Sequence, residues 1–391
     1  MRMARWGLCG LAAALLAGAP ALAQQPLKIG LIMPYTGQFT DASAQMDNAI
    51  KLYIKQHGDV VAGRKIELIR RDDAGSPDVA KRMARELVVN DNADILAGFV
   101  ITPEALAVAD LSEQAKKLMV VMNAATAIIT TKSPYIVRSS LTIPQVEEAF
   151  GAWVYKSGVR NIYTLVSDYA PGIDAETSFT RAFTAAGGKI VGSLRVPLAN
   201  PDFSAFVQRI MDAKPEAVFI FVPGGAQPAA LAKAFRERGI DSTKMKIFGQ
   251  GEITEENALR GMGDAALGII TAFHYDHTHD SKVNKAFVAA YNAEYKRNPD
   301  LFSVGGYDGM HVIYAALRKT GGKSDGEALI AAAKGLAWES PRGPVSIDGE
   351  TRDIIQNVYF RKVEKVGGVL QNVEFEKVEH VKDPVKARMA K

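Results

Sequence analysis

The sequence predicts an α/β protein of two doubly wound lobes, which are joined by a hinge of several crossings and have a cleft between them. Three observations support this fold class. Short apolar runs alternate with amphipathic stretches, as in βαβ units on a parallel sheet. The alternation begins again near residue 144, and the chain of 391 residues exceeds what one hydrophobic core usually holds.

The first 23 residues are predicted to be a signal peptide. Arg2 and Arg5 precede an apolar run over residues 8–22, which ends in small residues before Gln24. Glycines and a proline interrupt this run, and it falls short of the roughly 20 apolar residues that a spanning helix needs. The only cysteine, Cys9, lies inside it, so the mature chain has no thiol or disulfide chemistry. We therefore expect export and a periplasmic location.

The charge pattern excludes several kinds of partner. Without Arg2 and Arg5, 45 basic residues face 43 acidic ones, and the two signs are interspersed along the chain. This pattern is not that of a nucleic-acid-binding protein, and no later segment is long and apolar enough for membrane insertion of the mature chain. We expect a monomer without a cofactor.

The first lobe is predicted from strands and helices that alternate from residue 27 onwards. Strands are expected at 27–33, 66–70, 95–98 and 118–122, with helices at 42–56, 77–90 and 103–116. The helix at 42–56 is indicated by Met46, Ile50 and Tyr53, which share one face. Pro77 and Pro103 stand at positions that a first helical turn tolerates.

The second lobe repeats this rhythm. A helix at 144–156 is followed by strands at 162–166, 189–196, 217–222 and 246–248, and by helices at 173–186, 203–213 and 227–238. Gly187, Gly188 and Gly239 are placed as C-terminal stops of helices.

The last third of the chain is expected to cross back to the first lobe and then return to the second. A strand at 269–273 precedes helices at 282–297, 304–320 and 325–334 and strands at 345–347, 355–363 and 368–375. The lobes are thus expected to comprise residues 27–142 plus 271–340 and residues 143–270 plus 341–380. No Pro- or Ser-rich linker separates them, which favours a hinge over a flexible tether. The charged tail at 377–391 is expected to fray.

Five strand-to-helix loops suggest a ligand site. They are rich in small, hydroxyl-bearing or aromatic residues and comprise residues 34–39, 99–102, 123–126, 167–172 and 223–225. In parallel sheets, ligands bind beyond the carboxyl ends of the strands, where helix N-termini present free N–H groups. Small residues allow a close approach, and hydroxyl groups can bind a carboxylate. The loops therefore predict a site for a small carboxylate-bearing molecule.

Enzyme motifs are absent from the sequence, so no catalytic residue is assigned. No phosphate-binding loop, nucleophile elbow or His-Glu-x-x-His helix occurs. Residues 274–280 contain His274, His277 and His279 with two aspartates, a set that could hold a divalent metal. A periplasmic metal-dependent hydrolase is therefore the alternative hypothesis. A solvated loop is the favoured interpretation, and no metal ligand is assigned.

At this point the sequence resembles the type I periplasmic binding proteins of the leucine/isoleucine/valine-binding family. The resemblance runs from about residue 27 to 375 and rests on residues 28–31, 34–37, 72–77, 123–126 and 306–308. It implies two lobes joined by three crossings, closure on the ligand, and the membrane permease of an ABC importer as partner. A ligand sensor on the same fold is a further alternative.

The resemblance also implies which residues contact the ligand. The first lobe would hold the carboxylate with backbone amides and hydroxyls, and the second lobe would close over it. The predicted ligand contacts are Tyr35, Phe39, Val100, Ile101, Thr102, Ala124, Ala125, Thr126, Tyr169, Gly224, Gly225, Gln250, Glu252, Tyr275 and Tyr307.

The residue that decides between ligand classes is Glu252. Amino-acid binders of the family place an acidic residue in this loop to meet the ligand's ammonium, and here the acid stands one place late. If Glu252 points away, burying an unpaired ammonium would be costly. Residues 169–174 and 249–254 resemble the branch that includes receptors for aromatic acids. The predicted ligand is therefore a hydrophobic or branched-chain amino acid or an aromatic acid.

Overall fold

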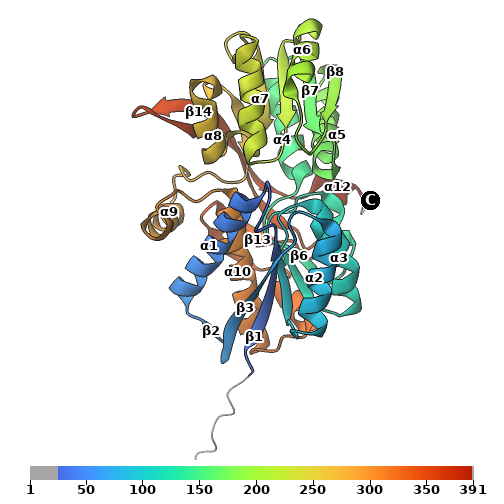
Figure 1. Ribbon diagram of the computed structural model, residues 1–391, viewed down its shortest axis with the longest axis vertical. Helices are drawn as coiled ribbons and strands as arrows, with labels where there is room; N and C mark the ends of the chain where they lie inside the picture. The colour runs from blue at the N-terminus through green and yellow to red at the C-terminus, as the bar shows by residue number, and fades with distance from the viewer. Residues whose placement is uncertain (1–24, 390–391) are drawn as a thin grey trace, which may run out of the picture.

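The computed structural model describes residues 25–389, which fold into two α/β lobes (Figure 1). The predicted fold class is thus confirmed. The predicted signal peptide lies outside the described residues. None of the helices in the described part of the chain has the length and apolar character that a membrane span requires.

The first lobe is built on a sheet with the strand order β2-β3-β1-β4-β5-β6. Its strands are β1 (Leu27–Met33), β2 (Val60–Val61), β3 (Arg64–Asp72), β4 (Ile95–Gly98), β5 (Leu118–Val121) and β6 (Ile136–Arg138). Except for the short β2, the neighbouring strands pair in parallel. Their carboxyl ends therefore meet at one edge of the sheet.

Helices cover both faces of this sheet. α1 (Thr40–His57) and α10 (Leu301–Thr320) pack together on one face, and α2 (Pro77–Val89) and α3 (Thr102–Gln114) on the other. η1 (Ala127–Thr131), α9 (Lys282–Tyr295) and α11 (Gly326–Ala333) complete the lobe. Because side chains alternate along a strand, Leu31 packs with the α1 side while Ile32 packs with the α2 side.

The second lobe is built on strands in the order β14-β11-β10-β9-β7-β8. The strands are β7 (Asn161–Ser167), β8 (Lys189–Val196), β9 (Ala217–Phe221), β10 (Lys246–Gln250), β11 (Ile270–Phe273) and β14 (Ile354–Val366), with β15 (Val369–Val381) paired to β14. α4 (Ile143–Lys156) and α5 (Ala170–Ala185) cover one face, where Phe219 stacks on Phe179 with ring centroids 4.0 Å apart. The other face carries α6 (Phe203–Ala213), α7 (Ala226–Glu237), η2 (Gly251–Thr254), α8 (Glu256–Met262) and η3 (Gly263–Ala266).

The chain passes between the lobes after β11 and again before β14. β11 extends the second sheet to Phe273, since it pairs with both β10 and β14. β12 (Ala337–Ser340) and β13 (Gly343–Ile347) form a hairpin next to the first lobe, where Trp338 donates from Nε1 to Asp308 of α10 at 2.9 Å. The chain then enters the second lobe along β14.

A buried arginine ties two of the crossings together. The guanidinium of Arg342 donates to the carbonyl oxygen of Ser140 at 2.7 Å and to that of Ser139, both just before α4. It also pairs with Asp308 of α10 at 2.7 Å and donates to Gln356 of β14 at 3.0 Å. The crossings after β6 and before β14 are therefore held in one network.

The prediction that the charged tail frays is wrong for its described part. β15 continues to Val381, and α12 (Pro384–Met389) follows it. Lys386 is buried and pairs with Asp353, whose carboxylate also accepts from Arg138 at 2.9 Å. The charge of the tail thus has a buried partner, which the sequence pattern does not reveal.

Candidate functional site

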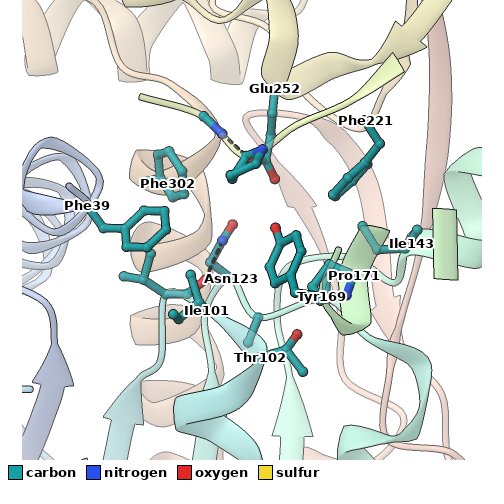
Figure 2. A pocket seen from close by; sticks show the side chains of 15 residues that line it. Phe39, Ile101, Thr102, Asn123, Ile143, Tyr169, Pro171, Phe221, Glu252 and Phe302 are labelled. Carbon is teal, nitrogen blue, oxygen red and sulfur yellow. Dashed lines mark hydrogen bonds between the residues drawn. The ribbon is translucent and has the colours of Figure 1, made fainter. Parts of the chain in front are cut away.

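A pocket lies between the lobes at the edge where the carboxyl ends of both sets of strands meet. Its lining comprises Phe39, Val100, Ile101, Thr102, Asn123, Ala124, Ala125, Ile143, Tyr169, Pro171, Phe221, Pro223, Gly224, Glu252 and Phe302. Figure 2 shows Thr102 and Glu252 on opposite sides of this space, with aromatic rings between them. The pocket thus has two polar ends and an apolar middle.

The first-lobe end is made of hydroxyl and backbone groups. Thr102 is the first residue of α3, and N–H groups of a first helical turn have no partner within the helix. Its Oγ1 donates to Oγ1 of Thr126 at 3.0 Å, which fixes the rotamer of Thr102. Asn123 donates from Nδ2 to the carbonyl oxygen of Val100 at 2.8 Å, while its buried Oδ1 has no partner among the described residues. The donors that this end can offer an anion are the N–H groups at the start of α3 and the hydroxyl pair of Thr102 and Thr126, which can turn one proton towards a ligand. None of these donors carries a full positive charge.

Two buried acidic residues, Glu104 and Asp73, lie next to the loop that forms this end of the pocket. Glu104 of α3 accepts through Oε2 from the backbone N–H of Ile101 at 3.2 Å. Burial and the neighbouring Asp73 raise the pKa of Glu104 to about 9, and burial raises that of Asp73 to about 6. The loop that carries Val100 and Ile101 therefore packs against a buried carboxyl group whose surroundings favour the neutral form.

Aromatic and aliphatic side chains form the middle of the pocket. Phe39 precedes α1 and Phe302 lies in the first turn of α10, both in the first lobe. From the second lobe, Phe221 ends β9 and Tyr169 precedes α5, with ring centroids 6.3 Å apart. This arrangement suits a flat apolar group such as an aromatic ring.

The second-lobe end is dominated by Glu252. Its Oε2 accepts from the backbone N–H of Gly224 at 2.8 Å, and the side chain is buried. Burial raises the pKa of Glu252 to about 7, against the lowering effect of the Gly224 N–H. The residues that line the pocket include no arginine, lysine or histidine. A ligand carboxylate would therefore be held at the first-lobe end, away from Glu252.

Most of the predicted site residues either line the pocket or lie directly behind its lining. Those that the structure brings together on the pocket are Phe39, Val100, Ile101, Thr102, Ala124, Ala125, Tyr169, Gly224 and Glu252. Thr126, Gly225 and Gln250 lie next to the lining: Thr126 holds Thr102, Gly225 precedes α7, and Gln250 accepts through Oε1 from the N–H of Glu252 at 3.0 Å.

Three predicted tyrosine contacts do not line this pocket. Tyr35 donates its backbone N–H to Asp72 at 2.9 Å, and its side chain packs against the core of the first lobe. Tyr275 donates to Asn284 at 3.0 Å and packs between α1 and α9. Tyr307 lies beside Tyr53 and donates to Gln56 at 2.6 Å. The side chains of Tyr275 and Tyr307 belong to the first lobe's helix packing, so neither enters the proposed site.

The histidine cluster is dispersed in the structure. His274 is buried beside Phe273, His277 lies near Asp276, and Nδ1 of His279 is 2.9 Å from Oε2 of Glu374. Within residues 25–389, no group of three His, Cys, Asp or Glu side chains is arranged to hold a metal ion. The hydrolase hypothesis therefore finds no metal centre among the described side chains.

Six lining residues are not among the predicted contacts: Asn123, Pro171 and Pro223 lie in the predicted loops, whereas Ile143, Phe221 and Phe302 lie outside them. The last three were missed by sequence reasoning altogether. Each lies at the edge of a regular element and not in a loop of polar composition: Ile143 and Phe302 occupy first turns of helices, and Phe221 ends a strand. The available signal was the cap before each helix, since Thr142 and Asp300 both make capping boxes. These caps mark where a helix begins at the cleft.

Two α/β lobes that enclose such a pocket define a binding protein for a small molecule. The sequence matches the family described as "Periplasmic binding protein" over residues 26–368, and the chain belongs to this family. The resemblance stated from sequence is thus confirmed.

Curated relatives and solved structures agree with this assignment. The chain is 42% identical to the Leu/Ile/Val-binding protein homolog 6 of Brucella melitensis over 93% of this chain and 94% of that protein. It is 56% identical, with a TM-score of 0.90, to an ABC transporter solute-binding protein of Rhodopseudomonas palustris BisB5 in complex with 3,4-dihydroxybenzoic acid, over 92% of this chain and 99% of that one. A protein of the same kind from Rhodopseudomonas palustris HaA2, in complex with p-hydroxybenzoic acid, is 41% identical with a TM-score of 0.90 and covers 93% and 100%.

Proposed function

We propose that the protein is the extracytoplasmic receptor of an ABC importer and that it captures a small aromatic acid by closing its two lobes. The observation that carries this proposal is the polarity of the pocket. Neutral hydrogen-bond donors at Thr102 and the neighbouring loops face Glu252 across a middle made of Phe39, Phe221 and Phe302. A benzoate-like molecule has the matching order of carboxylate and ring.

An amino acid fits this pocket less well. Its ammonium and carboxylate are attached to the same carbon, whereas Thr102 and Glu252 lie on opposite sides of the pocket (Figure 2). An ammonium far from Glu252 would be buried without a counter-charge, which is costly. The relatives in complex with hydroxybenzoic acids support the same choice.

Further parts of the function follow from the family. We also propose that the chain is exported through its signal peptide, delivers its ligand to a membrane permease and is a monomer. Ligand binding would shift the lobes towards the closed form because that form offers contacts from both lobes at once.

Isothermal titration calorimetry on the mature chain tests which class of ligand the protein binds. Benzoate, 4-hydroxybenzoate and 3,4-dihydroxybenzoate are compared with leucine and phenylalanine, and we expect binding to aromatic acids only. Glu252→Gln is the matched variant: any amino-acid binding should depend on the Glu252 carboxylate, whereas binding of a plain aromatic acid should depend on it far less. Tight binding of leucine, lost on Glu252→Gln, would instead establish an amino-acid receptor.

A further inference from the structure

Next to the pocket, the second lobe buries polar atoms that have no hydrogen-bond partner. Glu147 of α4 is 0% exposed, and neither of its carboxyl oxygens has a partner in the described part of the chain. Gln250, at the end of β10, is also 0% exposed, and its Nε2 has none among the described residues. Such groups are rare in native proteins and need a specific explanation.

Helix periodicity connects Glu147 to the pocket. Ile143, which lines the pocket, lies four residues before Glu147 and therefore on the same face of α4. Phe150 is three residues further along, and its ring centroid is 6.0 Å from that of Phe248 in β10. Glu147 thus stands between the pocket wall and the contact of α4 with β10.

Strand alternation places Gln250 in the same layer. Phe248 and Gln250 point to one face of β10, while Gly249 between them faces Ile253 on the other side. Glu252 lines the pocket and adjoins Gln250, because its N–H donates to Oε1 of Gln250 at 3.0 Å. Gln250 and Glu147 therefore lie in the layer directly behind the lining residues Glu252 and Ile143.

The unpaired atoms indicate what kind of group belongs there. Nε2 of Gln250 is a donor and requires an acceptor, whereas the carboxyl groups of Glu147 and Glu252 offer acceptors. Burial raises the pKa of Glu147 well above its usual range, which favours the neutral form of its carboxyl group. An ammonium has no acceptor and would leave Gln250 unpaired, but a hydroxyl group both donates and accepts.

We infer that Glu147, Gln250 and Glu252 form a hydroxyl-binding end of the pocket, which selects aromatic acids with a ring hydroxyl over unsubstituted benzoate. This inference rests on the proposed function, because the carboxylate at the first-lobe end directs the opposite side of the ring towards these three residues. Glu147 acts here as a specificity-determining residue.

Comparing the affinities for hydroxylated and unsubstituted benzoates tests this inference. Dissociation constants for benzoate, 3-hydroxybenzoate, 4-hydroxybenzoate and 3,4-dihydroxybenzoate are measured by titration calorimetry on the mature protein and on Glu147→Leu. We expect the unmodified protein to bind at least one hydroxylated acid about tenfold more tightly than benzoate, the effect of one well-made hydrogen bond. Glu147→Leu should bring the two affinities to about the same value and leave benzoate binding intact.

Two further variants control the experiment. Glu148→Leu makes the same replacement on the same helix, at a carboxylate that pairs with Arg181 and Arg388 away from the pocket, and it should keep the hydroxyl preference. Glu147→Gln keeps a donor and an acceptor and should retain most of it. Circular dichroism and thermal melting of each variant confirm that it is folded.

Each outcome is decisive. An unchanged hydroxyl preference in Glu147→Leu overturns the inference, as does tighter binding of leucine or phenylalanine than of every hydroxybenzoate. If the unmodified protein binds benzoate and its hydroxylated forms equally, the hydroxyl-binding end is refuted while the proposed function stands. If it binds none of the aromatic acids, both fall.

Discussion

Replacing Glu147 with leucine should stabilise the ligand-free protein, and it should do so more at neutral than at acidic pH. The carboxyl group is fully buried with no partner for either oxygen in the described chain. An unpaired buried polar group costs about 1–3 kcal/mol, and leucine removes this cost at similar volume. The free energy of unfolding should therefore rise by about that amount even where Glu147 is protonated in both states.

The pH dependence follows from the direction of the pKa shift. Burial raises the pKa of Glu147 in the folded protein well above 4.5, its ordinary value. Above that value the unfolded chain loses the proton while the folded protein keeps it, so the stability of the unmodified protein falls as pH rises. The slope is about 1.4 kcal/mol per pH unit up to the folded pKa, and below the unfolded pKa this loss is absent. Between about pH 5 and about pH 7 the advantage of Glu147→Leu should therefore grow with pH. The slope of about 1.4 kcal/mol per pH unit is an upper limit, because Glu252 contributes to the shift and titrates in the same range.

Urea unfolding followed by circular dichroism measures this difference. The unmodified protein, Glu147→Leu and Glu148→Leu are compared at about pH 5, 6 and 7 without ligand. Taking the difference in unfolding free energy between two proteins removes the contribution of buried acids that both proteins retain. A lower stability of Glu147→Leu at every pH, or a difference that does not change with pH, would mean that the carboxyl group is already partnered or ionised. The reasoning behind the hydroxyl-binding end would then fail.

Three other predictions use different parts of the structure. Thr102→Val should weaken binding of an aromatic acid by about 1–3 kcal/mol and Thr126→Val by less, because Thr102 lines the pocket while Thr126 only positions it; equal losses in calorimetry would contradict this. Asp353→Asn should cost about 3–5 kcal/mol of unfolding free energy, since it leaves Arg138 and Lys386 buried without their carboxylate. The exposed pair of Asp264 and Lys365 is its control, and Asp264→Asn should cost less than about 1 kcal/mol in the same urea titration. Gly172→Ala should lower the melting temperature and weaken ligand binding, because its Cβ would stand 1.9 Å from the carbonyl oxygen of Ser167 and displace the start of α5 beside Tyr169. Gly349→Ala, where a Cβ meets nothing within 4 Å, should leave both quantities unchanged.

Local patterns in the sequence predicted most of the architecture. The alternation of apolar runs and amphipathic stretches located most strands and helices of both lobes, but not the short strands β2, β6 and β12. The end of the chain depends on long-range contacts that these patterns do not reveal. The charged end of β15, beyond the predicted strand at 368–375, and α12 fold because β14 offers an edge and Asp353 a buried partner for Lys386. Composition near residue 380 contains no sign of either neighbour.

The site was predictable where loops carry it and not where packing does. Thr102, Ala124 and Gly224, which were predicted from small and hydroxyl-bearing loops, lie on the pocket lining. Phe302 reaches the pocket only because the chain returns to the first lobe. Tyrosine is a residue type that often contacts ligands, yet the side chains of Tyr275 and Tyr307 pack among the helices of the first lobe. In the sequence, Glu147 cannot be distinguished from an ordinary helix residue. Only the packing of α4 against β10 shows that its carboxyl group is buried.

The interleaving of the chain between the lobes has a consequence for biogenesis. The first lobe needs α10, which ends at Thr320, and the second needs β14, which begins only at Ile354. The first lobe therefore cannot finish folding before residue 320 has been made, nor the second before β14 has been made. Compact domains usually fold in turn as they leave the ribosome, whereas this topology delays the first core until a segment that follows most of the second lobe has been made. A chain that must cross a membrane before it folds would benefit from that delay.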